Sequence, residues 1–224
     1  MNEYLQNIGI YTENIDLYTK AFTHKSYSNE KEVESNERLE FLGDAVLELI
    51  VTNYLYQKFP EFPEGKLTAF RSALVRKESL AKTAKILDLG SQILLSKGEK
   101  RSKGGEKDYI LANTVEAILG AIFLDLGMEQ ATLFIETYLL VSLDEIIEEN
   151  KHIGPKSALQ EYTQAEKMGT PTYELISEEG PDHQKNFIMG VFLEEKLIEK
   201  GIGNSKQKAE SDAAKNALTK LQNI

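Results

Sequence analysis

The chain contains 224 residues, of which 41% are hydrophobic and 28% charged, and it has no cysteine. This composition is ordinary for a soluble globular protein with one large or two small domains. The lack of cysteine excludes a disulfide framework, a thiolate metal site and a cysteine nucleophile. No apolar run approaches the roughly 20 residues of a membrane span, and the first residues do not resemble a signal peptide. We therefore expect a cytoplasmic protein with no membrane partner.

The net charge of −10 is distributed unevenly along the chain. Residues 1–150 carry 16 Lys and Arg against 25 Asp and Glu, whereas residues 151–224 carry 10 against 11. Neither part is a polycation, so any contact with nucleic acid must depend on a local basic patch.

The first part of the chain is predicted to be an all-α domain. Apolar residues recur at three- and four-residue steps, which is typical of amphipathic helices, in the segments 39–56, 67–87, 109–126 and 131–147. Turn-forming or polar stretches separate these segments at 59–63, 88–90, 98–105 and Gly127. A charged stretch followed by Gly154 and Pro155 predicts a flexible linker. We place the domains at 1–148 and 155–224, with the linker at 149–154.

An acidic stripe lies in the first of these helices, in the segment NERLEFLGDAVL (36–47). Glu37, Glu40 and Asp44 are spaced i, i+3 and i+7, which places three carboxylates on one helix face. No Lys or Arg follows at i+4, so a divalent cation is the best candidate to compensate the repulsion. The alternative is a solvated acidic face. Gly43 in the middle of this helix indicates a close backbone approach to another helix or a ligand.

A second apolar helix is interrupted by Asn113 and Glu116, again at i and i+3. Two apolar helices that each carry a short polar face can converge on one site. The sequence therefore predicts one hard-metal site built from oxygen ligands, where the face with Glu37, Glu40 and Asp44 meets the face with Asn113 and Glu116.

The last part of the chain is predicted to be an α+β domain in the order α-β-β-β-α. A helix at 157–167 and a helix at 205–221 flank three strands, at 172–178, 186–194 and 196–202. Residues 180–183 read as a turn.

Several motifs resemble the ribonuclease III family of double-stranded-RNA endonucleases. The segment 36–47 resembles the family signature, His24–Tyr27 resembles its HKSY element, 63–68 its PEG-x-LT turn and 98–107 the loop before its second acidic helix. The α-β-β-β-α part resembles a double-stranded-RNA-binding domain. The resemblance implies a homodimer that uses Mg²⁺, or Mn²⁺ in its place, to cleave duplex RNA. It also implies 5′-phosphate and 3′-hydroxyl ends, short 3′ overhangs, and a role in ribosomal-RNA precursor and messenger-RNA processing.

The resemblance also implies roles for residues of the first domain. Asp44 and Glu116 would be catalytic, the metal would be held by Glu40, Asp44, Asn113 and Glu116, and Glu37 and Glu64 would line the outer cleft. Asn113 stands where the family usually has Asp, which keeps an oxygen ligand and removes one negative charge. The alternative is therefore a protein that binds duplex RNA and cleaves it poorly.

Three surfaces of the second domain suit the shallow minor groove and flanking phosphates of duplex RNA. The candidate contacts are Gln160 and Glu161 on the first helix, His183 in the 180–183 turn, and Ser205, Lys206 and Lys208 at the start of the last helix. A helix N-terminus with lysines favours phosphate, although two lysines in a first turn can also be merely solvated. Gln207 replaces the second of two adjacent basic residues that the family usually has.

Three further features of the first domain have open interpretations. His24 is either an RNA contact or a structural cap at a helix start. The 97–107 loop either contacts phosphates or is solvated and mobile. Phe41 and Leu42 belong either to the core or to the dimer interface that the family resemblance implies.

Overall fold

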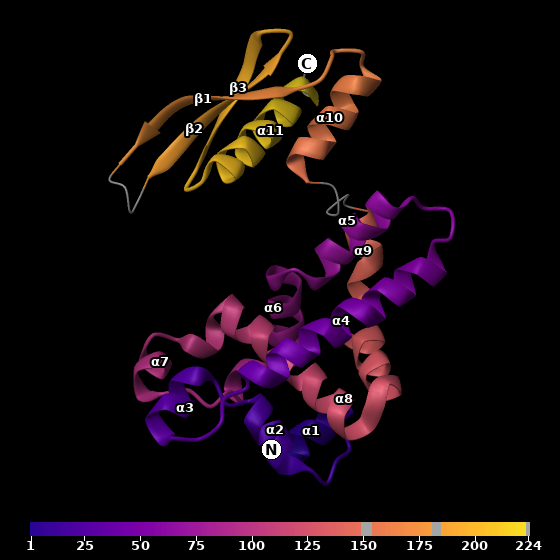
Figure 1. Cartoon of the computed structure of the whole chain (residues 1–224), viewed down its shortest axis with the longest axis vertical. Helices are drawn as coiled ribbons and strands as arrows, with labels where there is room; N and C mark the ends of the chain where they lie inside the picture. Colours follow the sequence, from indigo (N-terminus) through magenta and orange to yellow (C-terminus); the bar gives the residue numbers. More distant parts are fainter. Residues whose placement is uncertain (149–153, 181–184, 223–224) are drawn as a thin grey trace. The chain divides into compact units, whose positions relative to one another are not determined.

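The computed structural model describes residues 1–148, 154–180 and 185–222 (Figure 1). The chain divides into two compact units, Met1–His152 and Ile153–Ile224. Most of the linker that we predicted at 149–154 lies outside the described residues.

The described part of the first unit contains helices and no named strand, as predicted. Its elements are α1 (Asn2–Asn7), α2 (Ile15–Ala21), α3 (Lys25–Lys31), α4 (Glu37–Lys58), α5 (Glu64–Val75), α6 (Lys77–Ile86), η1 (Leu89–Ser91), α7 (Lys97–Arg101), η2 (Gly104–Glu106), α8 (Asp108–Tyr138), η3 (Leu140–Ser142) and α9 (Leu143–Glu148).

Two predicted helices are divided in the structure. The segment 67–87 belongs to α5 and α6, because Arg76 between them is extended, with ψ of 151°. The segment 131–147 is divided among the end of α8, η3 and α9. Apolar periodicity continues across a single extended residue or a short 3₁₀ turn, so the pattern alone did not reveal these breaks. The predicted break at Gly127 is confirmed, since its φ of +83° and ψ of −178° interrupt α8.

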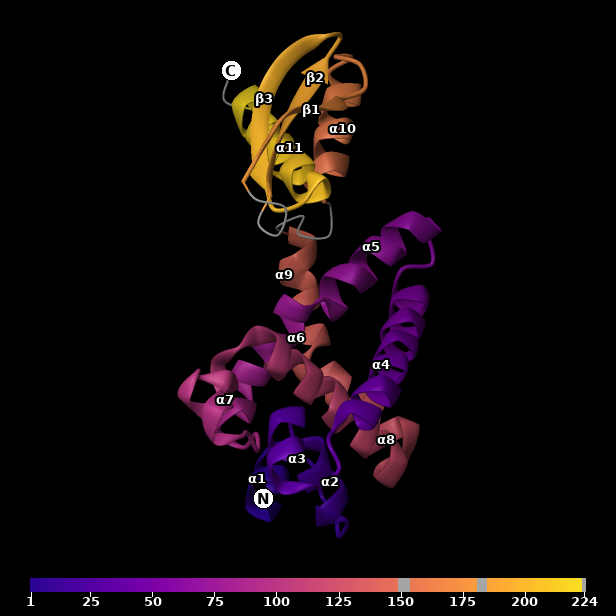
Figure 2. The same ribbon diagram turned by 60° about the vertical axis from the view of Figure 1, so that its left-hand side comes forward.

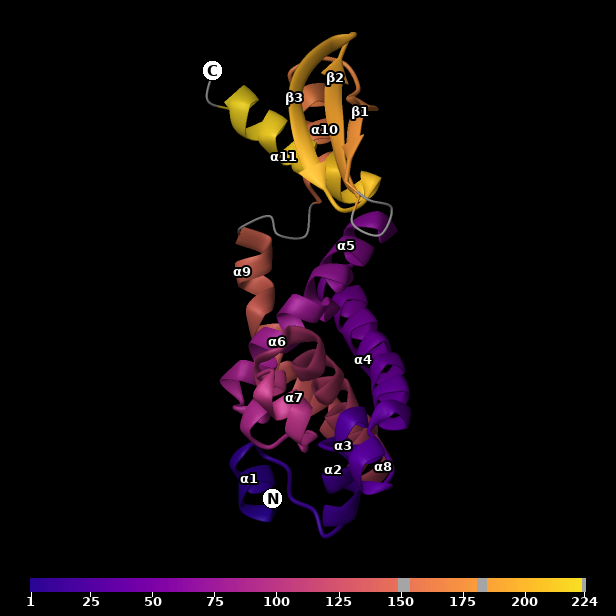
Figure 3. The same cartoon turned by 90° about the vertical axis from the view of Figure 1, so that its left-hand side faces the viewer.

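The helices α4 and α8 cross at two glycines, and Figures 2 and 3 show the two helices together in the first unit. A Cβ atom on Gly43 would lie 1.7 Å from the carbonyl oxygen of Glu116, and one on Gly120 would lie 2.3 Å from that of Leu39. Neither position therefore tolerates a side chain without moving the backbone. The close backbone approach predicted at Gly43 is confirmed, and it brings the polar faces of both helices to one place.

Helix α8 lies at the centre of the core. The segment Asp108–Ile147 is long and apolar enough to span a membrane by length and composition, so our statement that no apolar run approaches that length is wrong. Most of its apolar window is buried inside the protein. Its side chains from Ile110 to Ile122 pack with those of α4 and α6 in one continuous core, which is the ordinary reason for a helix to be hydrophobic all round.

The second unit has the predicted order α-β-β-β-α. It consists of α10 (Pro155–Ala165), β1 (Thr172–Glu179), β2 (Asn186–Leu193), β3 (Lys196–Gly203) and α11 (Lys206–Gln222), and the sheet is antiparallel in the order β1-β2-β3. Both helices cover one face of the sheet (Figure 1).

The small residues of α11 explain how closely this helix packs on the sheet. Its alanine stripe is buried at Ala209, Ala213 and Ala217. A Cβ atom on Gly201 of β3 would lie 2.0 Å from the backbone nitrogen of Ala213. The backbones of α11 and β3 are therefore in close contact at this point, beside the core formed by Leu159, Val191, Ala213, Ala214 and Ala217.

Candidate functional site

The predicted metal-site residues gather where α4 crosses α8. The side-chain amide of Asn113 donates a hydrogen bond of 2.9 Å from Nδ2 to Oε1 of Glu40. The structure therefore brings together two residues that are 73 positions apart in the sequence. Asn113 uses in this bond the amide group that an aspartate would lack.

The carboxylates at the crossing interact unfavourably with one another. Burial, and to a smaller extent the charges of Asp44 and Glu40, together raise the pKa of Glu116 to about 7. Burial also raises the pKa of Glu40, against the lowering effect of its hydrogen bond from Asn113. Both carboxyl groups are thus held in a setting that disfavours their ionised form. A bound cation would reverse this effect by favouring the ionised carboxylates.

The donor set fits a hard divalent cation. Three carboxylates and one amide oxygen are the ligand types that Mg²⁺, Mn²⁺ and Ca²⁺ prefer. Within the described ranges, no group of three or more His, Asp or Glu side chains is close enough to form a ready cage.

The two residues assigned to the outer cleft lie in different places. Glu37 begins α4, and its Oε1 accepts a 2.7 Å bond from Nζ of Lys25, which lowers the pKa of Glu37. Glu64 begins α5 and accepts from the hydroxyl of Thr68 at 3.0 Å. It shares a pocket with Tyr56, near the far end of α4. Along α4, Tyr56 is about 18 Å from Asp44, so Glu64 does not join this site within one chain.

Lys25 is a site neighbour to which we assigned no role from sequence. The motif HKSY included it, and its ion pair with Glu37 places a positive charge one helical turn before Glu40. This charge opposes the rise in the pKa of Glu40. The sequence signal that could have identified Lys25 is its position as a basic residue in the HKSY motif, shortly before the acidic helix.

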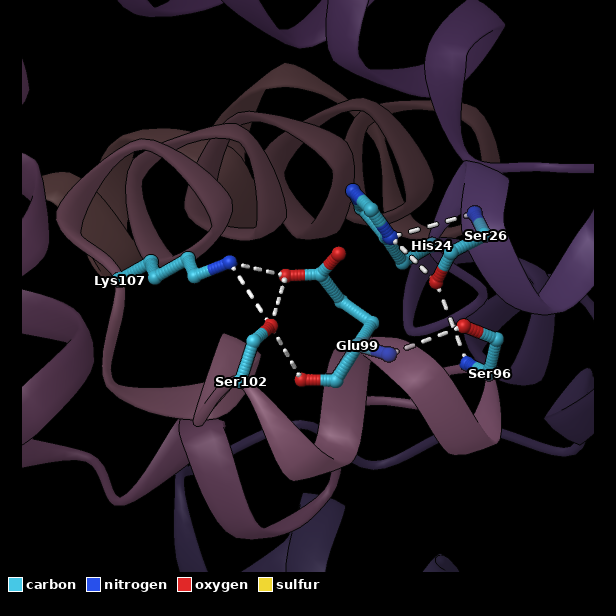
Figure 4. Close-up of polar contacts among 6 residues, drawn as sticks. All are labelled: His24, Ser26, Ser96, Glu99, Ser102 and Lys107. Carbon is cyan, nitrogen blue, oxygen red and sulfur yellow. Dashed lines mark hydrogen bonds and ion pairs between the residues drawn. The ribbon is translucent and has the colours of Figure 1, made fainter.

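Other open interpretations of the first unit now have answers. His24 is a helix cap, because its Nδ1 accepts from the backbone nitrogen of Ser26 at 3.2 Å (Figure 4). The segment 97–107 is largely ordered as α7 and η2 and is not a mobile loop. Phe41 is 82% exposed, so its interpretation as core is wrong.

In the second unit, the described RNA-binding candidates lie on its surface. Gln160 and Glu161 are exposed on α10, and Lys206 and Lys208 are exposed at the start of α11. Ser205 caps α11, its hydroxyl accepting from the backbone nitrogen of Lys208 at 3.3 Å.

The starts of α10 and α11 are joined by an ion pair of 2.6 Å between Lys156 and Glu210. This contact keeps the two helix starts near each other on the unit. The remaining candidate, His183, lies outside the described residues, as does most of the 180–183 turn.

A helical unit with carboxylates at a helix crossing, joined to an α-β-β-β-α unit with exposed lysines at a helix start, defines a two-domain enzyme that acts on nucleic acid. Comparison with known proteins agrees with this class. The family model described as Ribonuclease-III-like matches residues 14–143, and the double-stranded RNA binding motif matches residues 155–221.

Relatives named Ribonuclease 3 align along nearly the whole chain. The Enterococcus faecalis protein is 46% identical, over 98% of this chain and 96% of its own length. The Borreliella afzelii protein is 43% identical, over 100% and 92%. The solved nuclease domain of ribonuclease III from Campylobacter jejuni has a TM-score of 0.59 and 43% identity, covering 62% of this chain and 94% of that domain.

The chain belongs to the ribonuclease III family and is an endoribonuclease that acts on double-stranded RNA. These matches do not favour the alternative of a protein that only binds duplex RNA. The family generally depends on divalent metal ions.

Proposed function

We propose that this enzyme hydrolyses phosphodiester bonds of duplex RNA with Mg²⁺, leaving 5′-phosphate and 3′-hydroxyl ends with short 3′ overhangs. The observation that carries the proposal is the half-buried carboxyl group of Glu116, which faces the charges of Glu40 and Asp44 at the helix crossing. Such uncompensated acidic groups are costly unless a cation is part of the working site.

The residues of the crossing divide the work between them. Glu40, Asp44, Asn113 and Glu116 would hold the cation, and Mn²⁺ could take the place of Mg²⁺. A cation bound there would polarise a phosphoryl oxygen and make a water molecule more acidic. Asp44 and Glu116 orient the reacting groups, and the hydrogen bond from Asn113 fixes Glu40. Glu37 remains a candidate contact at the edge of the cleft.

We also propose that the enzyme is a homodimer. Helix α4 carries Phe41, Leu49 and Tyr56, whose exposed fractions are 82%, 57% and 71%. They fall on one side of the helix, so α4 presents an apolar stripe to solvent. One structure of the related Campylobacter jejuni nuclease domain is described as flexible in a region involved in dimer formation. A homodimer would contain two cleavage sites, and each would cut one strand.

The second domain, which we place at 155–224, supplies most of the binding energy in this proposal. Lys206 and Lys208 contact phosphates at the N-terminus of α11, where backbone N–H groups and the helix dipole also favour anions. Gln160, Glu161 and His183 reach 2′-hydroxyl groups in the minor groove. We further propose that the enzyme acts in the cytoplasm on ribosomal-RNA precursors and messenger RNA.

The test is cleavage of a simple RNA duplex with and without Mg²⁺, followed by Glu116→Gln. We expect Mg²⁺-dependent cleavage by the wild type, and loss of cleavage with intact duplex binding in the variant. Glu136→Gln, which neutralises an exposed carboxylate on the same helix, is the matched control and should cleave normally. Cleavage by Glu116→Gln at the wild-type rate would show that the site is wrong. Binding without cleavage by the wild type, in either Mg²⁺ or Mn²⁺, would restore the binding-protein alternative.

A further inference from the structure

Three side chains from three elements of the second unit meet at the start of α10. The ammonium group of Lys156 lies 2.6 Å from a carboxylate oxygen of Glu210 on α11, and 4.6 Å from the ring centre of Tyr173 on β1. Burial, and to a smaller extent the charge of Glu210, raise the pKa of Tyr173 to about 12, so its hydroxyl stays neutral beside the carboxylate. We call Lys156, Tyr173 and Glu210 the anchor cluster.

Each charge of the anchor cluster would be unfavourable without the other. Lys156 is the second residue of α10, where a positive side chain opposes the positive end of the helix dipole. Glu210 lies four residues after Lys206 on α11, so it shares a helix face with that candidate phosphate contact. An unpaired carboxylate there would repel the phosphates of duplex RNA. The pairing of Lys156 with Glu210 offsets both effects.

The ion pair of the anchor cluster lies one helical turn from a candidate RNA contact on each helix. Gln160 comes four residues after Lys156, and Lys206 comes four residues before Glu210. Each separation is about 6 Å along the helix. The side chain of Glu210 is only 23% exposed, so the pair is partly shielded from solvent. Its geometry therefore affects the distance between the surface assigned to the minor groove and the surface assigned to phosphates.

Two other contacts between α10 and α11 hold later parts of α10. Leu159, in the middle of the helix, is buried in one core cluster with Ala213 of α11. Near the end of α10, the hydroxyl of Tyr162 donates to the carbonyl oxygen of Leu221 at 3.1 Å. Because both contacts lie beyond the first turn, they control its direction less than the ion pair of Lys156 does.

We propose that Glu210 is a positioning residue for duplex binding, which acts through Lys156 to hold the start of α10 against the start of α11. This inference rests on the proposed function, since it supports the RNA contacts assigned there. Glu210 and Lys156 do not touch RNA in this role. A partly exposed ion pair contributes little to stability, so its loss should change the spacing of the RNA contacts more than the folding of the unit.

The experiment measures RNA duplex affinity of the full chain, without Mg²⁺, for Lys156→Met and for Glu210→Gln. The first variant removes a positive charge and the second removes a negative charge. Electrostatics alone would therefore weaken binding by the first and strengthen binding by the second. We expect both variants to weaken binding about fivefold, the factor that one partly exposed ion pair can supply. The slope of log affinity against log salt should not change, because no phosphate contact is lost.

Glu199→Gln is the matched control, because it also removes the acidic partner of an ion pair on α11, that with Lys220 at 2.7 Å. It should leave duplex affinity unchanged or slightly stronger. The rescue variant exchanges the two charges, with Lys156→Glu and Glu210→Lys combined. It has the net charge of the wild type and should recover most of the affinity. The single-turnover cleavage rate at saturating enzyme should be the same in all variants, and thermal unfolding shows whether each is folded.

Duplex binding by Glu210→Gln that equals or exceeds that of the wild type would overturn the inference, because the carboxylate would then act through its charge alone or not at all. A salt slope reduced by about 1 in Lys156→Met would also overturn it, since Lys156 would then contact phosphate itself. A folded charge-exchange variant that binds as weakly as the single variants would contradict positioning too. Failure of the combined Lys206→Ala and Lys208→Ala variant to weaken binding would instead refute the proposed function.

Discussion

The two units expose their functional groups in opposite ways. In the first unit the carboxyl groups of Glu40 and Glu116 are partly buried at a helix crossing, where burial raises the pKa of both. In the second unit the candidate RNA contacts Lys206 and Lys208 extend into solvent from the start of α11. The first arrangement depends on how two helices pack, and the second depends mainly on local sequence.

This difference indicates which substitutions should affect the function of each unit most. A change in packing anywhere along the α4–α8 crossing alters the distances between charged groups, so its effect on chemistry is steep. Loss of one exposed phosphate contact removes one contribution among several, and such contributions add nearly independently. Changes made in each unit therefore test this contrast.

The largest effect is expected from Gly43→Ala. Its Cβ would lie 1.7 Å from the carbonyl oxygen of Glu116, so α4 and α8 must separate. We expect a loss of about 3 kcal/mol or more in the stability of the first unit and no detectable cleavage, with duplex binding retained. Calorimetry and a cleavage assay measure these effects. Gly65→Ala is the control, because nothing lies within 4 Å of its added Cβ, and it should be neutral or stabilising.

A smaller effect is expected when Lys206→Ala and Lys208→Ala are combined. Each lost phosphate contact should reduce the slope of log affinity against log salt by about 1. Binding should weaken for all duplex sequences, while the single-turnover rate at saturating enzyme and low salt changes much less. Lys215→Ala, also exposed but further along α11, is the control. Intact affinity with a collapsed single-turnover rate would mean that the roles of the two units are reversed.

The pH dependence of Mg²⁺ binding tests whether the carboxyl group of Glu116 at the helix crossing is a metal ligand. Because the pKa of Glu116 in the folded protein is raised from 4.5 to about 7, protons compete with the cation below that pH. Apparent Mg²⁺ affinity should rise about fivefold between pH 6 and 7 and level off above pH 8.

The same shift in the pKa of Glu116 predicts the direction in which the stability of the metal-free protein changes with pH. The raised pKa means that the folded state binds the proton more tightly than the unfolded state does. The stabilisation is therefore fully present below pH 4.5 and is lost as pH rises through about 7. Calorimetric titration of Mg²⁺ and thermal unfolding in EDTA measure both trends, and Glu116→Gln should remove them. A pH-independent Mg²⁺ affinity in the wild type would contradict the assignment.

Asn113→Asp adds one negative charge at the α4–α8 crossing of the first unit. The variant replaces the 2.9 Å hydrogen bond to Glu40 with repulsion, so the metal-free protein should be less stable. With Mg²⁺ the extra carboxylate should lower the half-saturating concentration about fivefold, from about 1 kcal/mol of added attraction. Melting temperatures with and without Mg²⁺ test both signs. Asn53→Asp, which adds the same charge at an exposed position of α4, should show neither effect.

The smallest effect is expected from Tyr173→Phe in the second unit. The hydroxyl of Tyr173 is buried and has no hydrogen-bond partner within the described residues. Removing an unsatisfied polar group should leave stability unchanged or raise it by about 1 kcal/mol. Duplex affinity should stay the same. A clear loss of stability on chemical denaturation would show that the hydroxyl does have a partner.

Local patterns predicted much of the fold. The acidic spacing of Glu37, Glu40 and Asp44, the break at Gly127 and the order of elements in the second unit all follow from periodicity and turn chemistry. The division between α5 and α6 at Arg76 was not predicted, because a single extended residue leaves the apolar pattern almost unchanged. The ordered structure of segment 97–107 was not predicted either, since the enclosure of Glu99 depends on Gly104 and Lys107 folding around it.

The sequence by itself predicted candidate cation ligands and a candidate phosphate-binding helix start, which stay predictions, and it identified the glycine that requires a close approach. These properties depend on residue type and on spacing within one helix, so they can be read along the chain. Only the tertiary structure decided that Asn113 bonds Glu40, that Lys25 pairs with Glu37, and that Glu64 lies elsewhere. The physical reason is that such contacts join residues distant in sequence, and their distances are set by how whole helices pack.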